Sequence, residues 1–265
     1  MTKTDVPGLR VPVIEFAPAR VLHTTPPKTG STSLLLSYLL MAGLAVPEGA
    51  VRAVLRQAQA DGSAAAAGLR LHFVAPAQLP AFYAAHAGWH LLCNVRSPYE
   101  RALSNWFSKL NRYAKRFDRP SYRYGKLRQV LGGPMAWPHI ERANVHMQKR
   151  ISFAAMLAGL ARNGVGFDSH FEQQSVLLAL DKVTYDRMIR LETMGSDLPQ
   201  AFEALGVPQA MTGRLAAIPH RNRTAARPSA LLDAEAVALI GRIYPDDCRL
   251  LGYDSPLDRQ TAQPG

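Results

Sequence analysis

The chain has 265 residues, a formal net charge of +11 and two cysteines, Cys93 and Cys248. This length suits one large α/β domain or two small ones. Two cysteines cannot form a disulfide framework and lack the spacing of a metal site, so we expect two free thiols in a reducing compartment. The charge favours an anionic partner but does not choose among nucleotides, acidic polysaccharides, nucleic acid and anionic lipid.

The N-terminal residues lack the unbroken apolar stretch of a secretory signal. The sequence contains no run of about 18 or more apolar residues, so no transmembrane helix is predicted. We therefore expect a soluble, cytoplasmic protein. Residues 1–19 are punctuated by prolines and are interpreted as an extended N-terminal arm, with residues 20–265 forming a single domain.

Strand and helix patterns alternate over the first 110 residues. Strands are predicted at 20–25, 69–74 and 89–95, and helices at 31–42, 51–67, 76–86 and 99–110. This alternation is typical of an α/β fold, with a P-loop-like parallel sheet flanked by helices. The C-terminal half is predicted to be mostly helical, at 151–162, 171–180, 197–205 and 233–244, with one further strand at 182–191.

The turn between the first predicted strand and helix carries the first chemical signal. It reads Pro27-Lys28-Thr29-Gly30-Ser31-Thr32-Ser33. A helix N-terminus with a glycine, several hydroxyls and a lysine is suited to binding phosphate or sulfate. In a nucleoside triphosphatase loop the lysine follows the glycine, whereas here Lys28 precedes Gly30. The alternative is an ordinary strand–helix turn with capping hydroxyls.

This segment resembles the 5′-phosphosulfate loop of sulfotransferases that use 3′-phosphoadenosine 5′-phosphosulfate (PAPS). A second segment, 95–106, resembles their 3′-phosphate motif, with Arg96 at a strand end and Ser104 eight residues later. The resemblance implies that residues 27–33, Arg96 and Ser104 hold PAPS as the donor and 3′,5′-ADP (PAP) as the product. Two such motifs in order on a βα pattern are more specific than either alone.

Further stretches extend the resemblance to about residues 20–254. Residues 168–174 are similar to a D-x-H-W-x-x-Q stretch of carbohydrate sulfotransferases of the membrane-anchored Golgi type and their bacterial relatives. A basic loop at 220–224 is similar to one that closes over the nucleotide, which implies that Arg221 and Arg223 contact it. The N-terminal membrane anchor of the Golgi type is missing, which favours a bacterial cytoplasmic enzyme.

Sulfuryl transfer needs in-line alignment, stabilisation of the leaving group and activation of the attacking hydroxyl. We expect no metal. Lys28 is assigned to the leaving phosphate, with ground-state phosphate binding as the alternative. For the general base we consider His72 first, because resembling enzymes that sulfate uronic acids carry a catalytic histidine in a similar strand. His170 is second and His23 third, and a structural histidine is the alternative for each.

The segment 109–128 is basic and aromatic, so we expect Arg116, Arg119 and Arg123 to bind an acidic carbohydrate acceptor. A solvated surface loop is the alternative. Two other functions compete with sulfuryl transfer: a nucleotide-dependent kinase, and a non-catalytic polyanion binder for which no nucleic-acid motif is found. The sequence leaves open the acceptor, the position that is sulfated and the oligomeric state.

Overall fold

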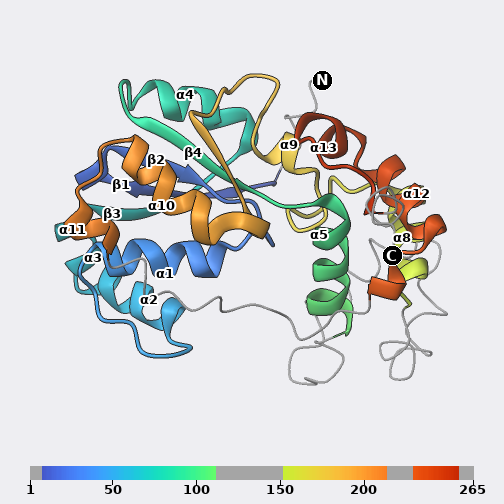
Figure 1. Ribbon diagram of the computed structural model, residues 1–265, viewed down its shortest axis with the longest axis horizontal. Helices are drawn as coiled ribbons and strands as arrows, with labels where there is room; N and C mark the ends of the chain where they lie inside the picture. Colours follow the sequence, from blue (N-terminus) through green and yellow to red (C-terminus); the bar gives the residue numbers. More distant parts are fainter. Residues whose placement is uncertain (1–7, 112–151, 214–228, 257–265) are drawn as a thin grey trace, which may run out of the picture. The chain divides into compact units, whose positions relative to one another are not determined.

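The computed structural model describes residues 8–111, 152–213 and 229–256 (Figure 1). The chain divides into two compact units, which are described separately. The sheet unit comprises residues 1–96 and 174–225, and the helical unit comprises residues 97–173 and 226–265. The prediction of one domain over residues 20–265 stays a prediction.

The sheet unit is built on five strands in the order β3-β1-β2-β4-β5. Their bounds are β1 Val11–Phe16, β2 Val21–Thr24, β3 Leu69–Val74, β4 His90–Val95 and β5 Arg187–Arg190. Strands β2, β4 and β5 are parallel, whereas β1 is antiparallel to both β2 and β3. The α/β class with flanking helices is confirmed. The sheet is mixed, because β1 runs antiparallel to its two neighbours while β2, β4 and β5 keep the expected parallel arrangement.

Strand β1 also corrects the expected N-terminal arm. Residues 11–16 lie inside the sheet between β3 and β2, and Val11, Val13 and Phe16 are fully buried. Pro12 argued against a strand within a sheet, because a proline lacks the backbone N–H that a strand donates to its neighbour. Here Pro12 precedes the first β1–β2 pair, Val13 with Thr24, and only its carbonyl is used, accepting the Thr25 N–H at 3.0 Å.

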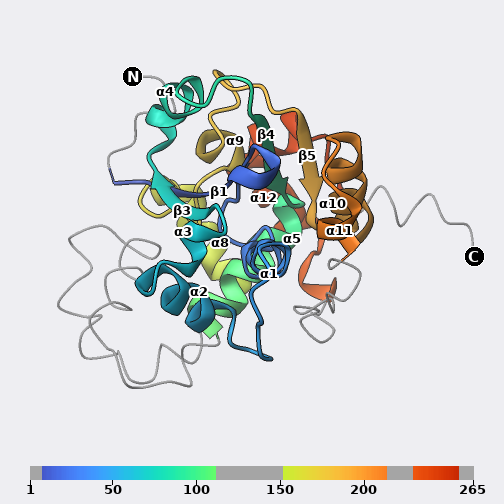
Figure 2. The same cartoon turned by 90° about the vertical axis from the view of Figure 1, so that its left-hand side faces the viewer.

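Helices cover both faces of this sheet (Figures 1 and 2). They are α1 Ser31–Met41, α2 Val51–Ala60, α3 Ser63–Ala66, α4 Leu79–Ala84, α9 Gln174–Leu177, α10 Met194–Ala204 and α11 Gln209–Thr212. Successive strand residues point to opposite faces. Ile14, Phe16 and Leu92 therefore share the face that packs on α1, in one core cluster with Leu34 and Leu39. Helix α4 lies on the other face.

The helical unit has its own core. Its described elements are α5 Pro98–Asn105, a π-helical turn Trp106–Asn111, α8 Phe153–Asn163, a 3-10 turn Ser229–Leu231, α12 Ala234–Ile243 and α13 Pro245–Leu250. Leu103, Met156 and Ile240 are buried together in one cluster. Side chains of Ser152 and Asp233 cap α8 and α12. No helix in the described ranges is long and apolar enough to cross a membrane.

Candidate functional site

The loop between β2 and α1 has a backbone that ordinary residues avoid. Gly30 has φ +91°, and a Cβ built there would lie 2.5 Å from the Leu191 Cδ1 atom. Lys28 also has a positive φ, 74°. This left-handed conformation costs a residue with a side chain roughly 1–2 kcal/mol. The positive φ favours glycine at position 30, and the strain at Lys28 indicates a loop held in one conformation by its surroundings.

The start of α1 is open to an anion. The first helical bond runs from the Leu34 N–H to the Gly30 carbonyl at 3.0 Å, so the N–H groups of Ser31, Thr32 and Ser33 have no helical acceptor. No side chain caps this end, and its first turn holds no acidic residue. The exposed donors and the positive end of the helix dipole therefore form an anion site. These features fit the 5′ end of a phosphosulfate donor.

Thr29 departs from the expected role. Its hydroxyl donates to the Pro26 carbonyl at 2.7 Å, and its side chain is fully buried. The hydroxyl therefore closes the turn and is not presented to an anion. The expectation that each hydroxyl of the loop adds a donor is wrong at this position, where the side chain faces the protein interior.

Arg96, at the end of β4, reaches the same loop. Its Nη1 donates to the Lys28 carbonyl at 3.3 Å. The Gln174 side chain binds both backbone groups of Arg96, accepting its N–H and donating to its carbonyl, each at 2.8 Å. The structure thus brings Lys28 and Arg96 together, as expected. It also adds Gln174, whose role as a positioning residue the sequence analysis missed although it ends the 168–174 stretch.

Ser104 lies on α5 in the helical unit and is buried. Its carbonyl accepts a hydrogen bond from the Ser108 hydroxyl at 2.8 Å. Pro98 occupies the first turn of α5, where its fixed φ suits a helix start. Because Arg96 belongs to the sheet unit, the pairing of Arg96 with Ser104 around one phosphate stays a prediction.

His23 is excluded as the general base. It is fully buried, with hydrogen bonds to the Tyr38 hydroxyl at 3.0 Å and to Asn94 Oδ1 at 2.7 Å. Burial lowers its pKa to about 3, and the bond to Asn94 opposes that shift only in part. The ring therefore stays neutral and enclosed, and it cannot meet an acceptor hydroxyl.

His72 lies on the edge strand β3 and faces the α4 side of the sheet. Its Nε2 is 2.7 Å from Glu15 Oε2, and Glu15 also lies 3.6 Å from the Arg70 guanidinium. Its ring contacts that of Phe82, with centroids 5.1 Å apart. This is the face opposite α1, and no contact described for the sheet unit joins His72 to Lys28. The role of His72 as the general base beside Lys28 stays a prediction.

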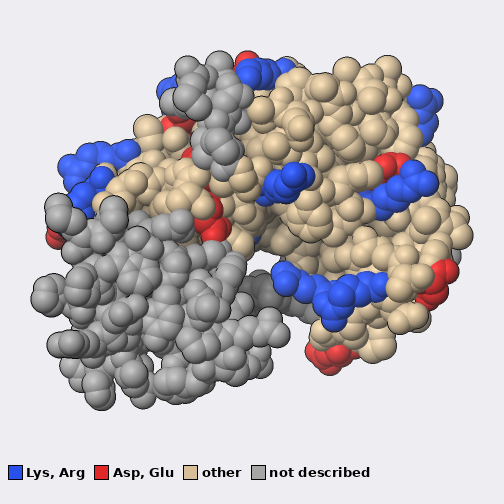
Figure 3. All heavy atoms as spheres, turned by 180° about the vertical axis from the view of Figure 1, so that it is seen from behind, with Lys and Arg blue, Asp and Glu red and all other residues tan. Residues whose placement is uncertain are grey.

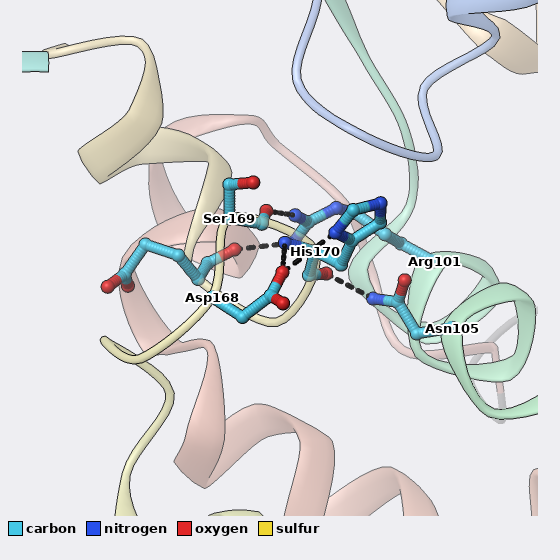
Figure 4. Close-up of polar contacts among 6 residues, drawn as sticks. Arg101, Asn105, Asp168, Ser169 and His170 are labelled. Atoms are coloured by element: carbon cyan, nitrogen blue, oxygen red, sulfur yellow. Dashed lines mark hydrogen bonds and ion pairs between the residues drawn. The ribbon is translucent and has the colours of Figure 1, made fainter. Parts of the chain in front are cut away.

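His170 belongs to a second carboxylate–histidine pair, in the helical unit (Figure 4). Its Nδ1 lies 2.7 Å from Asp168 Oδ1, and its backbone N–H donates to the same oxygen at 2.8 Å. A carboxylate only accepts, so Nδ1 carries the proton and Nε2 carries the lone pair of the neutral ring. This arrangement orients an imidazole for proton transfer.

Arg101 holds the backbone of that segment and was not foreseen. Its guanidinium donates to the carbonyls of Glu172 at 2.6 Å and Ser169 at 3.1 Å, while Asn105 donates to the His170 carbonyl (Figure 4). Only 2% of Arg101 is exposed. Burial lowers its pKa, and the negative charge of Asp247 opposes that shift most strongly. Arg101 is therefore a buried cation that fixes the shape of the 168–172 segment.

The remaining expected residues lie outside the described ranges. They are Arg116, Arg119, Arg123, Arg221 and Arg223. On the face shown in Figure 3, described basic side chains stand in separate groups rather than in one patch. Within the described ranges, no cluster of three or more His, Cys, Asp or Glu side chains could hold a metal ion. Cys93 and Cys248 are free thiols.

Comparison with known proteins gives one match. A family model described as "Sulfotransferase family" matches residues 80–254, which is more than half of the chain. The matched span includes Arg96, Ser104 and the 168–174 segment, and it begins after the loop at 27–33. Searches of curated proteins and of solved structures find no match. The assignment of that loop therefore depends on its geometry.

Proposed function

Because the chain belongs to the sulfotransferase family, we propose that it transfers a sulfuryl group from PAPS to a hydroxyl of a carbohydrate. Membership establishes sulfuryl transfer in general, and the donor and acceptor are our proposal. The observation that carries the donor is the hydrogen bond of 3.3 Å from Arg96 Nη1 to the Lys28 carbonyl. It joins the residue expected at the 3′-phosphate to the loop expected at the 5′ end.

The open start of α1 would hold the 5′ end of the donor, with its N–H groups and the hydroxyls of Ser31, Thr32 and Ser33 as ligands. Arg96 and Ser104 would hold the 3′-phosphate, which distinguishes this donor from ATP. Arg221 and Arg223 would close over the nucleotide. When bound, the donor supplies an activated sulfuryl group, and the residues of this chain orient it and neutralise charge.

Lys28 would stabilise the negative charge that grows on the leaving phosphate. Replacing Lys28 with alanine should lower turnover about 10²–10³-fold, the usual effect of removing one such donor. The measurement is steady-state sulfuryl transfer, together with a thermal unfolding curve that matches the wild type. Lys182→Ala, at an exposed lysine of the same unit, is the control and should keep full activity. Near-normal turnover of Lys28→Ala would remove this residue from the mechanism.

Two observations favour His170 over His72 as the general base. His170 lies in the matched span, and Asp168 binds both its ring and its backbone. His72 lies outside that span. We expect His170→Gln to lower kcat about 10²–10⁴-fold and to abolish the acid limb of the pH–rate profile. His72→Gln should keep both. The opposite result would make His72 the base, and two wild-type profiles would exclude both residues.

The carbohydrate acceptor is supported by the resemblance of 168–174 to carbohydrate sulfotransferases and by the net charge of +11, which suits an acidic glycan. The test is incubation with ³⁵S-labelled PAPS and a panel of neutral and acidic glycans and simple alcohols. Adenosine 5′-phosphosulfate, which lacks the 3′-phosphate, is the control donor. Label on an alcohol but on no glycan would overturn the carbohydrate and keep the transferase. A cytoplasmic location and a bacterial origin remain predictions from the sequence.

A further inference from the structure

Asn94 is a polar residue in the apolar strand β4, and it is fully buried. A buried amide without hydrogen bonds is costly, so its partners show what it is for. Its Nδ2 donates to the Thr29 carbonyl at 3.0 Å, and its Oδ1 lies 2.7 Å from His23 Nε2. Asn94 therefore joins the phosphate loop, residues 26–30, to the interior of the sheet unit.

The orientation of every group in this chain of hydrogen bonds follows from chemistry. The Thr29 carbonyl only accepts, so the amide nitrogen of Asn94 must face it and the amide oxygen must face His23. His23 then carries its proton on Nε2, and its Nδ1 accepts from the Tyr38 hydroxyl at 3.0 Å. All four side chains are fully buried. This neutral relay comprises Tyr38, His23, Asn94 and Thr29.

The far end of the relay is fixed by packing. The Tyr38 ring meets the rings of Phe16 and Phe202 edge-on, with centroids 5.5 and 5.8 Å apart. Close-packed rings in a core leave little room for movement. Asn94 is thus held in place by the core and can in turn hold the loop.

Strand alternation places Asn94 and Arg96 on the same side of β4. They bind consecutive carbonyls of the loop, Asn94 that of Thr29 and Arg96 that of Lys28. In a planar trans peptide the N–H points opposite to the carbonyl. Drawing the Thr29 carbonyl toward Asn94 on β4 therefore turns the Gly30 N–H away from β4.

We propose that Asn94 is a positioning residue for the donor site: it holds the Thr29 carbonyl so that the Gly30 N–H faces the 5′-phosphate of the nucleotide. This inference rests on the proposed function, because the ligand is the nucleotide half of PAPS. Asn94 touches neither the donor nor the acceptor. It acts through the backbone of the loop.

The test is calorimetric titration with 3′,5′-ADP of the full chain and three variants. Asn94→Ala should bind about tenfold more weakly, the change expected when one backbone donor is lost. Tyr38→Phe removes the hydroxyl at the far end of the relay and should weaken binding about two- to threefold. Tyr83→Phe is the matched control, since it removes another buried hydroxyl of the sheet unit, bonded to Thr24 and to Tyr185 at 3.2 Å. It should bind as the wild type does.

The control separates positioning from mere destabilisation, because thermal unfolding is measured for each variant. Should Asn94→Ala fail to fold, the two tyrosine variants decide the matter. If Asn94→Ala binds 3′,5′-ADP as tightly as Tyr83→Phe does, the positioning role is overturned while the proposed function stands. If Asn94→Ala does not fold, equal affinity of Tyr38→Phe and Tyr83→Phe has the same consequence. A wild type that binds no 3′,5′-ADP overturns both.

Discussion

Two segments of this protein are shaped by buried polar side chains, and the means differ. In the sheet unit, the neutral relay holds the loop at 26–30 through the bond from Asn94 to the Thr29 carbonyl. In the helical unit, the segment at 168–172 is held by the buried cation Arg101, with Asp247 and Glu172 as nearby negative charges. Asn94 and Arg101 each donate to backbone carbonyls, so each fixes the direction of the peptide groups in the segment that it contacts.

The difference sets how each segment responds to change. A neutral network leaves unsatisfied dipoles when it is broken, at about 1–3 kcal/mol each. An ion cluster leaves an unpaired charge, which costs more. A neutral network also avoids placing a fixed positive or negative charge beneath an anion site. The loop at 26–30 is thus held by the neutral Asn94 as well as by the cationic Arg96, whereas the 168–172 segment is held by a buried charge.

The largest expected effect follows from removing the buried cation of the helical unit. Arg101→Met leaves Asp247 and Glu172 without their buried cation, and should lower the free energy of unfolding by about 3–5 kcal/mol. Denaturant unfolding measures it. Arg249→Met is the control, because Arg249 pairs with Asp246 at 3.2 Å on the surface, where its side chain is 69% exposed. The control should change stability by at most about 0.5 kcal/mol. Equal effects would show that Arg101 is an ordinary surface-like arginine.

A smaller effect concerns the neutral relay and is seen in the pH dependence of stability. Burial lowers the pKa of His23 to about 3, so in acid the unfolded chain takes up a proton that the folded chain does not. Stability is therefore lost as pH falls below the ordinary histidine value, at about 1.4 kcal/mol per pH unit or about 2 kcal/mol between pH 6.5 and 5. Hydrogen exchange of α1 measures it. His23→Gln should remove this slope and His90→Gln should keep it. A slope that His23→Gln leaves unchanged would contradict a buried neutral His23.

The smallest expected effect is in the helical unit, where the pH dependence of stability has the opposite sign to that of His23. Burial raises the pKa of Glu172. Its contribution to stability is present below the ordinary carboxyl pKa and is lost as pH rises through the folded value. Glu172→Gln should therefore gain stability relative to the wild type between pH 4 and pH 8, by less than about 1 kcal/mol. Hydrogen exchange of α5 at the two pH values checks it, and a relative loss at pH 8 would contradict it.

The sequence predicted most of the fold where the local pattern was complete. Strand 69–74 and the helix start at Ser31 were expected where the structure has them. Strand β1 was missed because Pro12 suggested an arm, and only the register shows that Pro12, which has no N–H to donate, precedes the first β1–β2 pair. Pairing between distant strands is not encoded in local propensity.

The candidate site was likewise predicted only where the local sequence pattern was complete. Lys28 and Arg96 belong to recognisable motifs, and the structure shows that these two residues are in contact. Asn94 left a signal that was not used, a polar residue within a buried apolar strand, which requires a partner. Arg101 left none, since an arginine in a helix is usually solvated. Its burial depends on Glu172 and Asp247, more than 70 residues away along the chain.

We propose that this chain binds one nucleotide through phosphates at both its 3′ and 5′ positions. Calorimetric titration of the wild type and of Arg96→Gln with 3′,5′-ADP, with 5′-AMP and with ATP plus Mg²⁺ tests it most directly. We predict that the wild type binds 3′,5′-ADP at least about tenfold more tightly than 5′-AMP, an advantage near 1.4 kcal/mol that Arg96→Gln removes. Equal affinity for the two nucleotides, or tighter binding of ATP with Mg²⁺, would contradict the claim.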